Sequence, residues 1–491
     1  MGSEQDSCRC SRMSRRSFVG SMGAAAAATQ LGVFQFASSL FAAPEKPGKP
    51  TVRVAFVRPD KKRFFMGWPG ADWDNVEHEK RYSRILKDAA DDLDVDLRIR
   101  EEPLWKDDTG GFLQSLDKEQ PDGLILVSMC LHPTGWQVVD PVAKKRGDIP
   151  TIVFSPVGTS FTQHLQETRD LDGVFVGATE NEEWLSHGLR MLDTKWQMAH
   201  TRLTIVRGNE RKEQQVEGLG TTLQFYPEQE LCRLENEQEV TDKIRAIASY
   251  YEQNAERILE PTGEDILNAA KLYVVCRTVM EQENSDGISI NCLPLVSNEL
   301  GSENHMWEPC LAFSRLRDEG IVAGCESDVH AALGSRLSHL LLQKPGFMQD
   351  PAPLTVDNTL VGAHCTCPTR LAGFDSDPAP FILRNHQESD RGVAPQVLWP
   401  EGEKVTIMDM WAPPGTMHVG TGTVIKNIED DQTGDDPYEE AGGCRTSVKI
   451  SVDDVDDTRD VYGFHQLFIL GDEERRFRNY AQLANIDVKH I

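Results

Sequence analysis

The first part of the chain alternates short apolar runs with longer amphipathic stretches. Runs of strand length, either apolar or alternating between polar and apolar residues, lie at 52–57, 94–99, 123–127, 151–154 and 173–177. Between them, the segments 77–93 and 136–145 carry apolar residues at helical spacing. The run Gly-Leu-Ile-Leu-Val at 123–127 is apolar throughout, which is typical of a strand buried on both faces. Strands that alternate with helices predict a parallel, doubly wound α/β domain over 51–178.

The pattern continues over 179–345 with longer helical stretches. We expect helices at 181–200, 237–259, 263–283, 307–318 and 329–342. Short apolar runs predict strands at 203–206, 287–290 and 321–323. This segment therefore predicts a second α/β domain. Neither a Gly-x-Gly-x-x-Gly nor a Walker sequence is present, so a nucleotide cradle is not indicated.

After residue 345 Pro and Gly become frequent, and the helical period disappears until near the C-terminus. Six short alternating runs predict strands at 359–363, 381–384, 404–410, 420–428, 446–451 and 467–470. They indicate an all-β unit over 346–491, either a barrel or a sandwich. An acidic loop at 429–440 interrupts it, and a helix at 472–484 and a strand at 486–489 close the chain.

The N-terminus has the pattern of an export signal. Arg15 and Arg16 form a twin-arginine motif, followed by an uncharged stretch rich in Ala, Gly and Ser that ends at Ala42-Ala43. We interpret 1–43 as a cleaved Tat signal peptide and 44–50 as a Pro/Lys linker, so we expect a periplasmic or extracellular protein. An uncleaved membrane anchor is the alternative. No later segment has the apolar length to cross a bilayer.

The net charge and the cysteine content argue against nucleic-acid binding and against a disulfide framework. The net charge of −27 repels phosphate backbones and anionic lipid, so we expect no nucleic-acid partner. A neutral or cationic small molecule or a metal ion fits better. Two of the eleven cysteines belong to the signal, and the nine that remain are scattered and odd in number. They do not indicate a disulfide framework.

Four side chains near the ends of apolar runs could form a site. Glu326 follows the 321–323 strand, Asp350 precedes a proline in a loop, His364 ends a strand, and His465 lies near the C-terminus. Two carboxylates with imidazole suit Mn²⁺, Mg²⁺ or Fe²⁺. Each also has an ordinary structural interpretation, such as a helix cap, a turn residue or a buried histidine. His418 could be a turn residue or could line the pocket.

These residues also carry a resemblance. Phe347-Met348-Gln349-Asp350, the strand ending Gly362-Ala363-His364, and Gly463-Phe464-His465-Gln466 resemble segments of the L-fucose/L-arabinose isomerase superfamily. An early apolar strand that ends in Arg58-Pro59 resembles the fucose-isomerase branch. Gln349 stands where the arabinose-type sequence has a glutamate, and Gln466 where it has a second histidine.

The resemblance implies two doubly wound α/β domains followed by a C-terminal β-barrel-like domain, in a homo-oligomer of three or six chains. It implies a Mn²⁺ ion held by Glu326, Asp350 and either His364 or His465. The implied reaction is aldose–ketose isomerisation through an enediol, with Glu326 and Asp350 in proton transfer. Arg58 would hold sugar hydroxyls, and His418 is a further candidate for sugar binding. The rival hypothesis is a non-catalytic periplasmic sugar-binding or sensing protein on the same scaffold.

Overall fold

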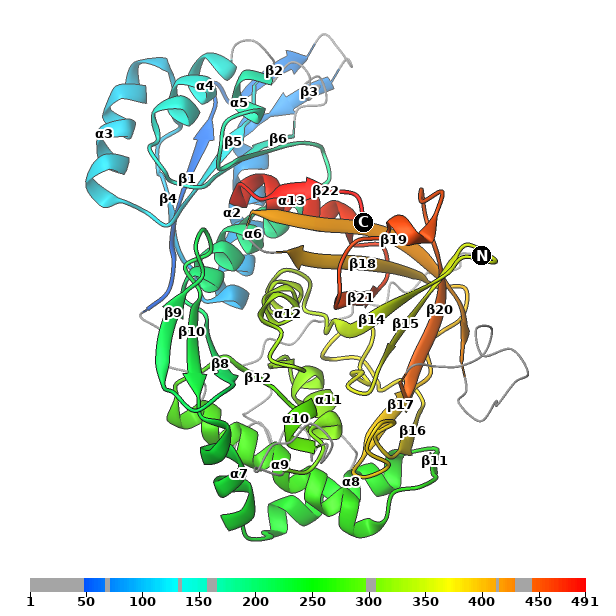
Figure 1. Cartoon of the computed structure of the whole chain (residues 1–491). Coiled ribbons are helices and arrows are strands. Elements are labelled where there is room, and N and C mark those ends of the chain that lie inside the picture. Colours follow the sequence, from blue (N-terminus) through cyan, green and yellow to red (C-terminus); the bar gives the residue numbers. More distant parts are fainter. Residues whose placement is uncertain are drawn as a thin grey trace, which may run out of the picture.

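The computed structural model describes residues 48–66, 71–130, 135–156, 166–296, 306–411, 415–428 and 444–491. The expected signal peptide and the acidic loop at 429–440 lie outside the described residues. The chain forms two α/β units and a β-barrel (Figure 1). In the part of the chain that the structure describes, no helix is both long and apolar enough to span a membrane.

The first unit is built on a fully parallel sheet. Its strand order is β4 (Asp96–Ile99), β1 (Thr51–Val57), β5 (Gly123–Ser128), β6 (Thr151–Ser155) and β7 (Val174–Ala178). The order reverses between β1 and β5, as in doubly wound folds. Its helices are α2 (Asn75–Leu93), α3 (Thr109–Glu119), α4 (Trp136–Lys145), α5 (Gln166–Arg169) and α6 (Glu183–Ala199). A hairpin of β2 (Arg63–Met66) and β3 (Ala71–Asp74) lies beside α2.

The alternation along β1 explains why this sheet is covered on both faces. Val54 and Phe56 pack in one hydrophobic cluster with residues of α2 and α6. Ala55 and Val57 pack in another with residues of α3 and α4. Successive strand residues point to opposite faces, so an apolar run without interruption requires a helix layer on each side.

The second unit has a mostly parallel sheet in the order β13 (Val322–Gly324), β12 (Gly287–Ile290), β8 (Arg202–Val206), β10 (Thr222–Tyr226) and the antiparallel β9 (Lys212–Gln215). Its helices are α7 (Glu228–Glu237), α8 (Asp242–Asn254), α9 (Gly263–Gln282), α10 (Leu293–Val296), α11 (Cys310–Asp318) and α12 (Val329–Leu342). The helix expected at 237–259 is α8, with shorter bounds. Glu237 ends α7, and α8 begins after Thr241, whose side chain accepts a hydrogen bond from the amide of Ile244.

The C-terminal unit is a closed six-stranded barrel. The strands follow one another as β18 (Lys404–Trp411), β21 (Gln466–Leu470), β14 (Phe347–Leu354), β15 (Thr359–His364), β20 (Thr446–Val452) and β19 (Thr416–Asn427). Pairing of β19 with β18 closes the ring. The sequence prediction of two α/β units and a β-barrel-like unit is thereby confirmed. Beside the barrel, β11 (Arg257–Ile258), β16 (Phe381–Arg384) and β17 (Ala394–Val397) form a small separate sheet.

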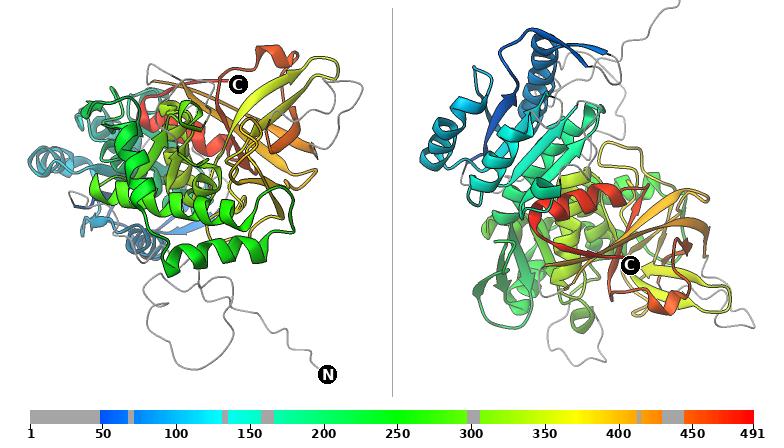
Figure 2. Two further views of the ribbon diagram at one scale, coloured as in Figure 1. Left: turned by 60° about the horizontal axis from the view of Figure 1, so that its bottom comes forward. Right: turned by 90° about the horizontal axis from the view of Figure 1, so that it is seen from above.

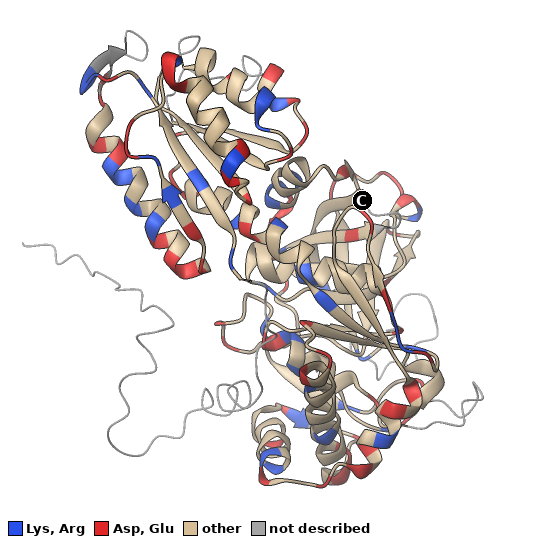
Figure 3. Cartoon of the chain, turned by 90° about the vertical axis from the view of Figure 1, so that its left-hand side faces the viewer, with Lys and Arg blue, Asp and Glu red and all other residues tan. Residues whose placement is uncertain are grey.

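Two helices connect the barrel to the α/β units. Helix α12 packs against β18 and β21, and it can approach closely because Gly334 has no side chain to meet Met408 and Leu467. Helix α13 (Glu474–Ala484) contacts β7 of the first sheet and β19 of the barrel, and β22 (Asp487–Lys489) then pairs with β19 (Figure 2). Acidic and basic residues are interspersed along the outer helices, whereas most positions of the central strands are uncharged (Figure 3).

Candidate metal centre

Glu326 lies at the carboxyl end of β13, in a sharp turn into α12. Glu326 and Ser327 both have left-handed backbones, with φ values of 55° and 49°. Non-glycine residues rarely adopt this conformation, and strained pairs of this kind concentrate at functional sites. The amide of Ser327 donates to the carbonyl of Ile290 at 3.0 Å, and Asp328 caps α12 by accepting from the amide of Ala331 at 3.0 Å. The turn therefore holds Glu326 at the end of the second sheet, where α/β folds bind ligands.

Asp350 lies on β14, although its sequence context suggested a loop. Its neighbour Gln349 faces the opposite side of the strand, toward the buried interior of the barrel. There the amide nitrogen of Gln349 donates to the side-chain oxygen of Gln466 at 3.0 Å. The two positions that depart from the arabinose-type pattern thus contact each other away from Asp350. The Asp350 side chain is 42% exposed and points toward the turn of Glu326 and His465.

His465 joins the carboxylates of both units. Its Nε2 lies 3.0 Å from Asp350 Oδ1 and 3.8 Å from Glu326 Oε2. On the other side of the ring, Nδ1 lies 2.7 Å from Asp328 Oδ2. Burial alone would lower the pKa of His465, but the carboxylates of Asp328 and Asp350 outweigh it and raise the pKa to about 9. The site therefore favours positive charge where Nε2 meets Asp350.

The pKa values of Glu326 and Asp328 are shifted in opposite directions. Burial raises the pKa of Glu326; His465 opposes this rise and the charge of Asp350 adds to it. Burial also opposes the charge of Asp328, but hydrogen bonds from His465 and from the amide of Ala331 outweigh it and hold the pKa of Asp328 below its usual value. Asp328 thus stays ionised beside His465, whereas Glu326 is the more basic carboxylate.

His364, at the end of β15, differs from His465 in its protonation. Its Nδ1 accepts a hydrogen bond from the amide of Cys365 at 2.8 Å, and burial lowers the pKa of the ring to about 4. A neutral imidazole that accepts at Nδ1 carries its proton at Nε2. In His465 the carboxylate of Asp328 instead holds a proton on Nδ1, so a metal ion that displaces the Nε2 proton would meet the lone pair of that nitrogen. The geometry therefore favours His465 as the metal ligand and His364 as a hydrogen-bond donor into the site.

The residues present fit a divalent cation. One ligand atom from each of Asp350, His364 and His465 lies within 4.8 Å of the others. Asp350 also lies 3.0 Å from Nε2 of His465, which is the ring nitrogen that faces away from Asp328. A carboxylate and imidazole set suits Mn²⁺, Mg²⁺ or Fe²⁺. Glu326, Asp350 and His465 could hold such an ion.

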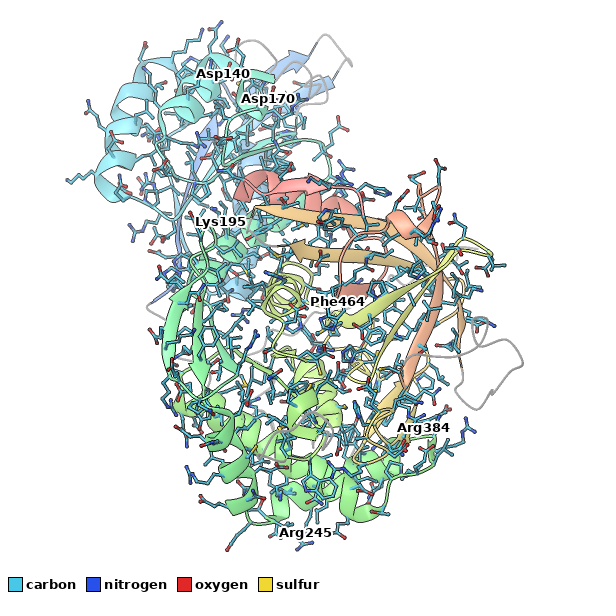
Figure 4. All side chains as sticks on the ribbon, in the orientation of Figure 1. Asp140, Asp170, Lys195, Arg245, Arg384 and Phe464 are labelled. Carbon is cyan, nitrogen blue, oxygen red and sulfur yellow. The ribbon has the colours of Figure 1, made fainter. Side chains whose placement is uncertain are left out.

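A large cavity opens beside this centre. It has a volume of about 860 Å³ and lies between the second sheet, the start of α12 and the barrel. Glu326, Asp328 and His465 form part of its wall, with Arg207 at the end of β8. Phe464, which is 60% exposed, projects toward the same space in the centre of Figure 4. The cavity thus offers carboxylates, a cation and an exposed aromatic ring to a small polar molecule.

Two of the sequence candidates lie apart from this wall. Arg58 forms a 2.6 Å ion pair with Glu79 and lines a separate cavity in the first unit. His418, on β19, lies 3.8 Å from Asp409 and stacks on Tyr462. Neither residue lines the cavity of Glu326. Their assignment to sugar binding remains a prediction.

A buried arginine that carried no signal in the sequence connects the segments of the candidate metal centre. The guanidinium of Arg317, on α11, donates twice to the carbonyl of Ala323, to the carbonyl and hydroxyl of Thr366, and to the sulfur of Met348. These three partners lie within a few residues of Glu326, His364 and Asp350. One fully buried side chain therefore fixes three segments of the centre relative to one another.

Replacement of Asp328 by asparagine tests whether it orients His465. We expect Asp328→Asn to weaken Mn²⁺ binding about 10- to 100-fold, because the amide no longer fixes the Nδ1 proton or supports the charge of the ring. Asn still caps α12, so the helix should be retained. Calorimetric titration with Mn²⁺ gives the affinity, and circular dichroism checks the fold. An unchanged affinity would show that Asp328 acts only as a helix cap.

The chain matches no known family model. It is 33% identical over 98 residues to a protein named sulfoquinovose isomerase from Alkalicoccus urumqiensis. The similarity covers 20% of this chain and 21% of the relative, so the match spans about a fifth of either protein. The chain therefore shows distant similarity to a sugar isomerase.

Proposed function

We propose that this protein is an exported aldose–ketose isomerase that depends on a divalent metal, with Mn²⁺ the best fit. The observation that carries the proposal is His465, whose Nε2 lies between Asp350 and Glu326 while Asp328 supports its Nδ1. The distant similarity to a sugar isomerase supports the reaction class. The twin-arginine sequence and the uncharged stretch that follows it within 1–43 support a periplasmic or extracellular location.

Different side chains of the site act as general base, as metal ligands and as hydrogen-bond donor. Glu326 is the general base, because burial raises its pKa and it faces the cavity. Asp350 and His465 complete the ligand set with Glu326. A bound divalent cation would supply electrostatic stabilisation of the negative charge that develops on the sugar oxygens. His364 lines the small enclosed cavity behind Glu326 rather than the large one, and its Nε2 proton can donate to an oxygen atom held beside Glu326 and Asp350.

The cavity suggests how a sugar is held. Exposed Phe464 offers an apolar face to the carbon side of a sugar ring. Arg207 lies on the wall of the same cavity and suits an anionic substituent, such as the sulfonate of sulfoquinovose. Arg58 lies outside this cavity, so its proposed role requires the first unit of a neighbouring chain in a homo-oligomer of three or six copies.

Solvent exchange tests the proposal directly. The Mn²⁺-loaded protein is incubated in D₂O with a panel of aldoses that includes sulfoquinovose, and the carbon beside the carbonyl is examined by NMR. We expect deuterium at this carbon and the matching ketose with at least one sugar. Asp350→Asn should abolish both the deuterium incorporation and the formation of ketose. The matched control is Asp357→Asn, which alters a solvent-exposed aspartate paired with Lys449.

The absence of deuterium with every sugar, in a protein shown to contain metal, would contradict isomerase activity. Binding of a sugar without exchange, measured by calorimetry on the same sample, would instead support the periplasmic sugar-binding hypothesis. Equal loss of exchange in Asp357→Asn and Asp350→Asn would point to a general effect on folding rather than to the site.

A further inference from the structure

Five of the nine described cysteines line one small enclosed cavity beside the metal centre. The cavity has a volume of about 40 Å³, and its wall also includes Glu326, Asp350 and His364. The cysteines come from segments far apart in the sequence, namely Cys292, Cys310, Cys325, Cys365 and Cys444. Scattered cysteines in the sequence are thus brought together in space. Thiols packed this closely can bind a thiophilic metal ion or oxidise to disulfides.

Two of these thiols are already in contact. Cys292 and Cys325 follow the neighbouring parallel strands β12 and β13. Their Sγ atoms lie 2.9 Å apart, closer than the roughly 3.5–4.0 Å of ordinary nonbonded contacts between heavy atoms. Both side chains are 4% exposed, so water does not separate them. The pair is placed for a bond between the two sulfurs.

Cys325 is also positioned to interfere with the metal centre. Its Sγ, a carboxylate oxygen of Glu326 and a ring nitrogen of His364 lie within 4.8 Å of one another. A thiolate in this position would favour Zn²⁺ and other thiophilic ions over Mn²⁺. A sulfur engaged in a disulfide carries no thiolate charge and is lost as a strong donor.

We propose that Cys292 and Cys325 form a disulfide that removes the thiolate from the metal centre and so makes the centre selective for hard cations such as Mn²⁺. This inference rests on the metal site of the proposed function. The oxidant is a small-molecule or protein disulfide of an oxidising compartment. The two thiols lose their protons and two electrons to form one S–S bond, and the oxidant is reduced to two thiols. The disulfide also ties together the ends of β12 and β13, from which the turn of Glu326 begins.

The test compares the full chain in two redox states. One sample is kept with a phosphine reductant, and the other is equilibrated with oxidised glutathione, which is then removed. Free thiols are alkylated, and disulfide-linked peptides are identified by mass spectrometry. We expect a 292–325 linkage in the oxidised sample. Competition between Zn²⁺ and Mn²⁺ should then show a preference for Zn²⁺ at least about tenfold stronger in the reduced protein.

Two variants test whether the Cys292–Cys325 pair, rather than another thiol, controls the metal preference. Cys325→Ser should show the low Zn²⁺ preference of the oxidised protein even with reductant present. Cys276→Ala, which alters a buried cysteine on α9 away from the cavity, should respond to oxidation as the original protein does. Because the peptide map is made on the unaltered chain, a variant that fails to fold does not remove the test.

The outcomes also separate this inference from the proposed function. A map that links only Cys310, Cys365 and Cys444 would overturn it, as would equal Zn²⁺ preference in the two redox states. Either result leaves deuterium exchange by the Mn²⁺-loaded protein untouched. Conversely, a redox-dependent metal preference in a protein without exchange would uphold the disulfide and contradict the isomerase.

Discussion

Replacement of His465 by glutamine should abolish tight binding of Mn²⁺ and, with it, the proposed isomerisation. Glutamine can still donate to Asp328 but offers no nitrogen lone pair to a metal ion. We expect the affinity for Mn²⁺ to fall by more than the about 100-fold that loss of an outer partner costs. Turnover should fall by at least about 100-fold, as when a group that stabilises developing charge is removed. Calorimetry and ketose formation measure the two effects.

His364→Gln is the matched control, because it makes the same change on the neighbouring imidazole. The amide of Cys365 fixes the proton of His364 on Nε2, so His364 should not be a ligand. We expect Mn²⁺ affinity to stay within a few fold, whereas turnover falls through loss of a donor, by about 10-fold. The reverse pattern, with metal lost in His364→Gln and kept in His465→Gln, would contradict the tautomer argument.

Much of the fold can be predicted because its strands and helices have strong periodicity. The apolar run 123–127 and the helix 329–342 appear in the structure as β5 and α12 with almost unchanged bounds. Other elements depend on tertiary contacts. The polar sequence of β9 is a strand only because β10 pairs with it, and β14 contains two prolines yet pairs with β15 and β21. Neither has a pattern of its own that favours a strand.

The structure brings Glu326, Asp350, His364 and His465 together, and all four stand near the ends of apolar runs in the sequence. Their roles as ligands and catalytic groups stay predictions. Which histidine has a free lone pair depends on hydrogen bonds at Nδ1, which no sequence pattern shows. Asp328 directly precedes α12, a position typical of a helix cap, but its contact with a histidine 137 residues away depends on the closed barrel.

The buried Arg317 should be indispensable to both stability and metal binding. Arg317→Met keeps an unbranched apolar stem but removes the donors for the carbonyls of Ala323 and Thr366. Each buried acceptor left unsatisfied costs about 1–3 kcal/mol. Burial lowers the pKa of Arg317 to about 10, so its charge is poorly solvated, and methionine relieves part of that cost. The expected net loss in the free energy of unfolding is about 3 kcal/mol, measured by urea denaturation.

Arg98→Met provides the comparison for this substitution. Arg98 is a surface arginine whose side chain is 48% exposed and pairs with Asp96, so its loss should change stability by less than about 0.5 kcal/mol. Metal affinity separates two roles of Arg317. If it aligns the segments of Glu326, Asp350 and His364, Mn²⁺ binding should weaken in Arg317→Met even under conditions where the variant is fully folded. A destabilised variant with unchanged Mn²⁺ affinity would show that Arg317 supports the core alone, because the ligand geometry would then be set by the turn of Glu326 and by Asp328.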